Sequence, residues 1–126
     1  LPPRATRVSA TTLGRAKVPT IDDPRATLIK GWFKDTWEEL YSHIADRENL
    51  LVNHDADLYS STLFELARMD TLRRPYLCVF DEFTGPETLA VAAYREAFGA
   101  KVELMGKIVM NGYAEQVLSR IVPHGS

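Results

Sequence analysis

The sequence predicts an α/β fold with a mostly parallel sheet, an antiparallel last strand and helices on both faces. Apolar runs of strand length alternate with segments of helical period, which is typical of a parallel sheet covered by helices. The last two predicted strands have no helix between them, so they must be antiparallel. With 126 residues, 45% hydrophobic and 25% charged, the chain has the size and composition of one globular domain.

The chain begins with a predicted loop, followed by one strand and one helix. Residues 1–24 carry scattered prolines and no apolar period, which predicts a loop or a mobile segment. Residues 26–33 are a short apolar run, and we expect a strand that ends at Gly31. Thr36 opens a sequence that fits a capping box, and apolar residues then recur at helical spacing, which predicts a helix over 36–46.

The middle of the chain supplies two further strands, each followed by a helix. Residues 50–54 and 76–80 are apolar runs, and the second is continuous, as in strands covered on both faces. Thr62 and Thr84 begin two more sequences that fit capping boxes. The second of these introduces a helix over 86–98, which the glycine that follows should end.

The end of the domain is a predicted strand pair. Residues 101–105 and 115–121 show partial alternation, and Asn111-Gly112 between them favours a hairpin turn. Residues 123–126 are a short polar tail. The predicted α/β domain therefore spans 25–122, between the N-terminal loop and this tail.

Composition narrows the classes of function. The net charge of −2 gives no reason to expect nucleic acid or an anionic membrane surface as a partner. No stretch approaches the roughly 18 apolar residues of a membrane span. The single cysteine, Cys78, lies in an apolar run and predicts a buried thiol rather than a nucleophile. The cysteine count and the lack of a secretory signal favour a reducing cytoplasm, although the arginine-rich start would also fit a transit peptide.

Acidic residues follow two predicted neighbouring strands at the point where each strand ends. Asp55 follows the first of these strands, and Asp81 and Glu82 follow the next. Ligands of open α/β sheets bind outside the carboxyl ends of the strands, and Mg²⁺ prefers carboxylate oxygens. The pattern predicts a divalent-metal site, but Asp57 and Asp81 could instead cap the helices that follow. No phosphate-binding glycine motif and no zinc-ligand cluster is present in the sequence.

Two further features have a functional and a structural interpretation. His54, beside Asp55, could act as a general base or a metal ligand. A strand histidine that is hydrogen-bonded to a neighbour is the simpler interpretation. Trp32, Phe33 and Trp37 could line a pocket for a flat ring, or they could pack in the core.

Three segments of the sequence occur in the order and spacing of a known family. They are residues 28–36 (LIKGWFKDT), 54–62 (HDADLYSST) and 79–83 (VFDEF). Together they resemble the macrocin O-methyltransferase family over about residues 20–121. Its members are class I sugar O-methyltransferases that use S-adenosylmethionine and Mg²⁺. The resemblance implies a partial Rossmann-like methyltransferase sheet and a small hydroxylated acceptor, such as a glycoside or another natural product.

The resemblance also implies roles for individual residues. Asp55 is expected to be a Mg²⁺ ligand and the catalytic group that takes the proton of the acceptor hydroxyl. Asp81 and Glu82 would supply further ligands, although many family members carry a shorter aspartate at the position of Glu82. Gly31 and Trp32 would lie near the adenine side of the cofactor.

The part of the family that the chain matches is its C-terminal half. The first strand and the glycine-rich turn that hold the cofactor precede this half in family members. Without that first strand, residues 50–54 would form an exposed apolar edge, and open edges recruit partners. We therefore expect a homo-oligomer or pairing with a missing N-terminal half.

Two other functions stay open from the sequence. The first is a non-catalytic methyltransferase-like remnant that acts as a binding or dimerisation module. The second is a glycosyltransferase-like domain that uses the triplet 55–57 to bind a metal and a nucleotide sugar.

Overall fold

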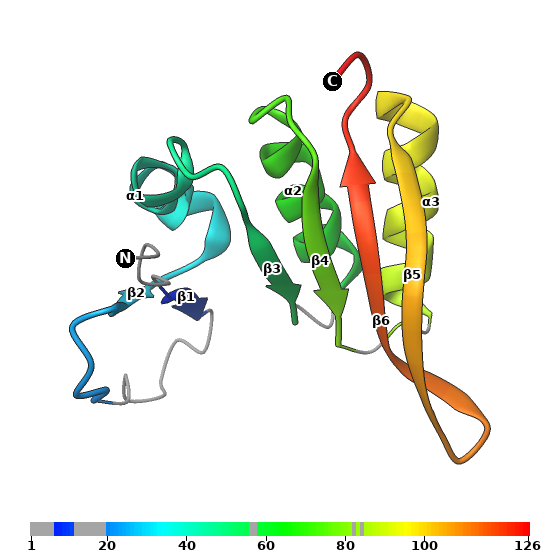
Figure 1. Cartoon of the computed structure of the whole chain (residues 1–126), viewed down its shortest axis with the longest axis horizontal. Coiled ribbons are helices and arrows are strands. Elements are labelled where there is room, and N and C mark those ends of the chain that lie inside the picture. The colour runs from blue at the N-terminus through cyan, green and yellow to red at the C-terminus, as the bar shows by residue number, and fades with distance from the viewer. Residues whose placement is uncertain (1–6, 12–19, 56–57, 82, 84) are drawn as a thin grey trace. The chain divides into compact units, whose positions relative to one another are not determined.

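The computed structural model describes residues 7–11, 20–55, 58–81, 83 and 85–126 (Figure 1). The chain divides into two compact units, Leu1–Arg47 and Glu48–Ser126, which we call unit 1 and unit 2. In chain order, the elements are β1 (Arg7–Thr11), β2 (Ala26–Lys30), α1 (Phe33–Ile44), β3 (Leu51–His54), α2 (Tyr59–Asp70), β4 (Tyr76–Phe80), α3 (Pro86–Phe98), β5 (Lys101–Met110) and β6 (Tyr113–Val122). None of the helices among the described residues has the length and apolar character that a membrane span requires.

Unit 1 is a pair of parallel strands with one helix packed on it. β1 pairs with β2 in a register that runs from Arg7 opposite Ala26 to Thr11 opposite Lys30. Helix α1 contacts both strands. The prediction of a loop over 1–24 was wrong for β1, because a five-residue strand without apolar alternation is stabilised by pairing with β2, which local sequence does not reveal.

Two predicted capping boxes were wrong. Helix α1 begins at Phe33, so Thr36 lies inside the helix, where its hydroxyl donates a hydrogen bond of 2.9 Å to the carbonyl oxygen of Trp32. Helix α2 begins at Tyr59, which likewise places Thr62 inside the first turns. A threonine hydroxyl can bond a carbonyl one turn earlier instead of capping an amide, and this is what Thr36 does. The third predicted cap, Thr84, lies outside the described residues.

Unit 2 is built on a mixed four-stranded sheet in the order β3-β4-β6-β5. β3 and β4 are parallel, whereas β4 pairs antiparallel with β6 and β6 pairs antiparallel with β5. The expectation of a mostly parallel sheet was therefore wrong. The reason is that β6 inserts between β4 and β5, which makes two of the three neighbouring pairs antiparallel. The prediction of an antiparallel last strand is confirmed.

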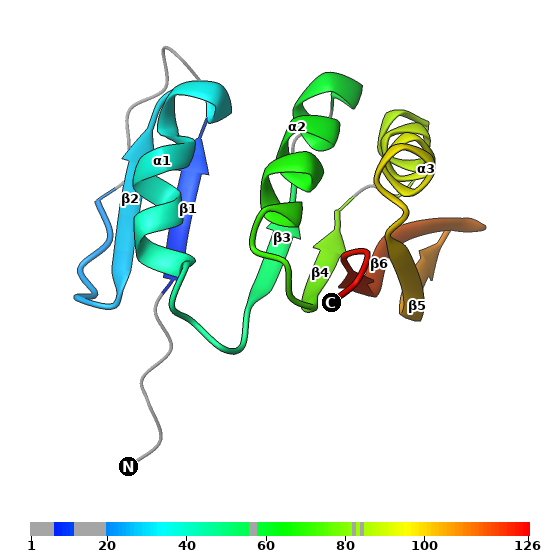
Figure 2. The ribbon, with the colours of Figure 1, turned by 90° about the horizontal axis from the view of Figure 1, so that it is seen from above.

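Both helices of unit 2 cover the same face of this sheet (Figure 2). Along β4, Tyr76, Cys78 and Phe80 are buried beneath the helices, while Leu77, on the other face, is 36% exposed. The expectation of helices on both faces does not hold for this sheet. A five-residue apolar run does not reveal whether one face or two are covered, because both cases place apolar residues at every position.

The hairpin of β5 and β6 is longer than predicted. Asn111 and Gly112 have φ angles of 52° and 80°, as both central residues of a type I′ turn require, so the predicted hairpin turn is confirmed. β4 pairs with β6 only from Val117 to Ile121. The turn end of the hairpin consequently extends beyond the end of β4 (Figure 1).

A buried polar network holds the helices and the C-terminus of unit 2 together. The Tyr94 hydroxyl on α3 donates a 2.6 Å hydrogen bond to Oδ1 of Asp70 at the end of α2. Nη1 of Arg73 lies 3.3 Å from Oδ2 of Asp70. Nη2 of Arg73 donates a 2.8 Å hydrogen bond to the carbonyl oxygen of His124. Pro123, the first residue of the expected tail, is buried, whereas the three residues after it are exposed.

We expect Tyr94→Phe to lower the free energy of unfolding by about 1–3 kcal/mol, because Oδ1 of the buried Asp70 loses its donor. Urea unfolding followed by circular dichroism measures the change. Tyr59→Phe, at a partly exposed phenol on the first turn of α2, is the matched control and should leave the midpoint unchanged. Equal midpoints for the Tyr94 variant and the unmodified chain would show that the Asp70 contact contributes nothing.

Candidate functional site

The structure brings Asp55 and Asp81 to the same edge of the sheet. The parallel register of β3 and β4 ends with His54 opposite Phe80, and the two aspartates are the next residues of their strands. The backbone amide of Asp81 donates a 3.2 Å hydrogen bond to the carbonyl oxygen of His54, which ties the two strand ends together. The predicted adjacency of the two strand ends is confirmed. We call this pair of strand ends the carboxylate edge.

Two other acidic residues were also expected in this region. Glu82, expected as a metal ligand, lies outside the described residues, and so does Asp57. Of the two aspartates that the structure describes at the carboxylate edge, Asp55 is exposed and Asp81 is half-buried.

The side chain of Asp81 has a partner that sequence reasoning missed. Nε2 of Gln116, on β6, donates a 2.9 Å hydrogen bond to Oδ1 of Asp81. The antiparallel register places Val117 opposite Phe80, so Gln116 lies across from Asp81 one step further along. No local signal could have found this contact, because it depends on β6 lying next to β4.

His54 is buried beneath the carboxylate edge and is hydrogen-bonded to a neighbour. Its Nδ1 lies 2.6 Å from Oε2 of Glu65 on α2, and its ring stacks on Phe80 at 5.2 Å between centroids. A carboxylate only accepts hydrogen bonds, so Nδ1 carries the hydrogen of this contact. Nε2 of His54 has no hydrogen-bond partner among the described residues. The structural interpretation of His54 is confirmed, and Glu65 is the partner that the sequence did not identify.

The donors of the carboxylate edge match the ligand chemistry of Mg²⁺. Proteins commonly hold Mg²⁺ through one or two carboxylates and leave the other positions to water or substrate oxygens. Asp55 and Asp81 would supply two such carboxylates. The residues that the structure describes form no group of three or more histidine, cysteine, aspartate or glutamate side chains arranged to hold a metal.

Gly31 and Trp32, the expected cofactor neighbours, lie in unit 1 at the junction of β2 and α1. Trp32 is 59% exposed, so its ring is open to a stacking partner. Trp37, by contrast, is buried, and the core-packing interpretation is confirmed for it. Gly31 has a steric reason to be glycine: its φ is 146°, and a Cβ would lie 2.8 Å from Cγ2 of Thr36.

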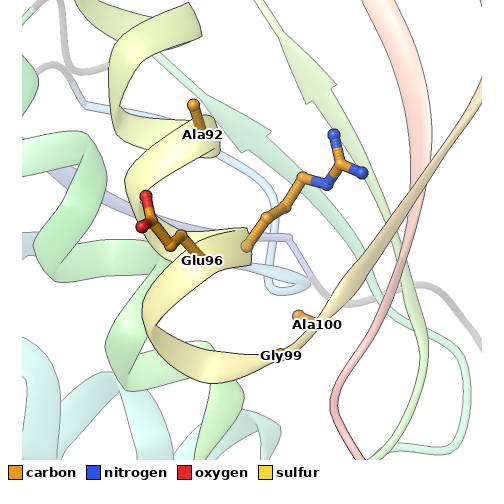
Figure 3. A pocket seen from close by; sticks show the side chains of 5 residues that line it. Ala92, Glu96, Gly99 and Ala100 are labelled. Atoms are coloured by element: carbon orange, nitrogen blue, oxygen red, sulfur yellow. The ribbon is translucent and has the colours of Figure 1, made fainter.

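Two shallow hollows lie elsewhere on unit 2. One, of about 450 Å³, lies where α3 leads into β5 and is lined by Ala92, Arg95, Glu96, Gly99 and Ala100 (Figure 3). The other, of about 360 Å³, is lined by Glu48, Asn49, Leu50, Leu51, Pro75, Tyr76, Leu77 and Arg120. The second hollow lies at the amino ends of β3 and β4, opposite the carboxylate edge, so neither hollow includes Asp55 or Asp81.

Cys78 is a structural thiol. It is fully buried on β4, and burial, together with the nearby carboxylate of Glu87, raises the pKa of Cys78 to about 12. A thiol in this state holds little thiolate at neutral pH and is a poor nucleophile. The prediction of a buried thiol is confirmed.

Comparisons with protein-family models, with curated proteins and with solved structures found no match to this chain.

We expect Gly31→Ala to destabilise the chain by about 1–3 kcal/mol, because alanine is strained at this φ and its Cβ meets Thr36. Thermal unfolding followed by circular dichroism measures the loss. Gly106→Ala is the matched control, since a Cβ at that position meets nothing within 4 Å. Adding Thr36→Ser, which removes Cγ2, should restore part of the lost stability; no restoration would argue against the steric contact.

The raised pKa of Cys78 also predicts how stability depends on pH. The unfolded thiol titrates near pH 8.5, whereas the folded thiol titrates at about 12, so the unfolded chain releases its proton first. The buried Cys78 thiol therefore makes its full contribution to the free energy of unfolding below about pH 8.5. Above that pH, the free energy of unfolding falls by up to about 1.4 kcal/mol per pH unit.

Urea unfolding between pH 8 and 10 should reveal this fall, and Cys78→Ala should flatten it while lowering stability at every pH. The window stops at pH 10 because the pKa values of Tyr76 and Tyr94 are also raised, chiefly by burial, and act in the same direction above it. Val91→Ala, a similarly buried truncation on α3, should keep the slope of the unmodified chain. A Cys78 variant with an unchanged slope would contradict the assignment.

Proposed function

We propose that the chain supplies the metal-binding side of a Mg²⁺- and S-adenosylmethionine-dependent O-methyltransferase that acts on a small hydroxylated substrate such as a glycoside. The observation that carries the proposal is the position of Asp55 and Asp81 at the adjacent carboxyl ends of two parallel strands. That is where ligands of open α/β sheets bind. The three segments that resemble the macrocin O-methyltransferase family include both aspartates and supply the reaction class.

Within this proposal, the described residues have separate tasks. Asp55, exposed at the end of β3, would hold the cation and would take the proton of the acceptor hydroxyl. Asp81 would hold the cation from the end of β4. The chemistry that Mg²⁺ supplies at such a site is a lowered pKa of the substrate hydroxyl. The exposed ring of Trp32 would be available to stack on the adenine of the cofactor.

We also infer a reducing compartment, the cytoplasm. Cys78 is a free, buried thiol. An isolated buried cysteine is common in proteins that do not need disulfides, and this supports the inference.

A second function, a non-catalytic binding or dimerisation module, is favoured by the edge of the sheet. β3 pairs with β4 alone in the four-stranded sheet, and Leu51 on it is 67% exposed. An apolar strand with an unpaired edge can add a strand from a second copy or from another polypeptide. This function needs neither a cofactor nor a catalytic carboxylate.

Titration calorimetry with Mg²⁺ tests the proposed metal site. We expect the unmodified chain to bind Mg²⁺, and Asp55→Asn and Asp81→Asn each to weaken binding by at least about tenfold, since each removes a charged oxygen ligand. Asp46→Asn is the matched control, because Asp46 is an exposed aspartate after α1, outside the carboxylate edge. Unchanged binding in both carboxylate variants would place the cation elsewhere.

A second titration, with S-adenosylmethionine in the presence and absence of Mg²⁺, separates the two functions. Binding of the cofactor supports the methyltransferase. Metal binding without cofactor binding supports the non-catalytic module. Binding of a nucleotide sugar instead would overturn the methyltransferase proposal.

A further inference from the structure

We propose that Gln116 is a positioning residue for Asp81: it holds Oδ1 and thereby leaves Oδ2 as the oxygen that meets the cation. The inference rests on the proposed function, because it concerns the same carboxylate edge. It adds a residue from β6, a strand that carries none of the ligands expected from the sequence.

Asp81 is hydrogen-bonded at two points to two different strands. Its backbone amide donates to the carbonyl oxygen of His54 at the end of β3, and its side chain accepts from Gln116 on β6. The first contact fixes where the residue lies, and the second fixes how its carboxylate is turned. A ligand that is oriented before the metal arrives binds it more tightly, and partners of this kind usually contribute strongly to metal affinity.

The side chain that donates to Asp81 is a neutral amide and not a cation. A lysine or arginine at position 116 would also bond Asp81, but its charge would compete with a cation for the same carboxylate. The neutral amide of Gln116 orients Oδ1 and leaves the charge of Asp81 in place.

The side chain of Gln116 is exposed, and Gln116 lies on β6 just beyond the last residue that pairs with β4. Its amide could be solvated by water instead, and ordering a long side chain carries an entropy cost. The side chain nevertheless reaches Asp81 at 2.9 Å, and removing it should leave the fold largely intact.

The test compares Gln116→Leu with the unmodified chain, using Mn²⁺ as the probe and electron paramagnetic resonance of free Mn²⁺ as the measurement. We expect binding about 10- to 100-fold weaker in the variant, with an unchanged midpoint of urea unfolding. Asn49→Leu is the matched control, because Asn49 is an exposed amide before the other end of β3. Nuclear magnetic resonance of the metal-free chain supplies a second measurement. The ¹³C chemical shift of the Asp81 carboxyl group should change in Gln116→Leu and should not change in Asn49→Leu.

The possible outcomes are distinct. If the unmodified chain binds Mn²⁺ and Gln116→Leu binds it equally well, the positioning role is overturned and the proposed metal site stands. If Gln116→Leu and Asn49→Leu weaken binding alike, the loss is not specific to Asp81 and the inference is also overturned. If the unmodified chain binds no Mn²⁺, the proposed metal site fails and this inference fails with it.

Discussion

The insertion of β6 between β4 and β5 is the constraint on which unit 2 depends. The tight Asn111-Gly112 turn sends the chain straight back along β5, and β6 then pairs on both of its edges. Because of this, alternate residues of β6 (Val117, Ser119 and Ile121) are buried on the face that α2 and α3 cover. The same insertion carries Gln116 to the end of β4. The β5–β6 hairpin thus supplies buried residues to the core and also the side chain that contacts Asp81.

Two pairs of polar side chains join elements of unit 2 beneath and between its helices. Asp70 and Tyr94 join α2 to α3, while His54 and Glu65 join β3 to α2. Apolar packing alone would allow a helix to slide or rotate on the sheet at small cost, whereas a buried hydrogen bond is satisfied in one arrangement. We infer that these pairs fix the register of α2 against both the sheet and α3. The carboxylate edge depends on that register because His54 immediately precedes Asp55.

The parts of the fold that the sequence predicted are those with local causes. β4 is a compact apolar run, and α3 begins at a proline and ends at Gly99 in the left-handed conformation, as predicted. The features that were missed have non-local causes. β1 is a strand because it pairs with β2, and the mixed sheet arises because β6 pairs with β4. The start of α1 was misplaced because a threonine can bond a carbonyl within a helix instead of capping its first amides, as Thr36 does.

The candidate site also has a part that the sequence predicted and a part that only the folded chain shows. Asp55 and Asp81 could be predicted because each directly follows a strand, and parallel neighbours end at one edge. Two carboxylates at one edge repel each other, and a protein can relieve the repulsion with a positive side chain, a shared proton or a cation. The partner seen on Asp81 is a neutral amide, which stabilises its orientation without cancelling its charge. Gln116 reaches Asp81 only because β6 lies next to β4, a pairing that the folded chain alone reveals.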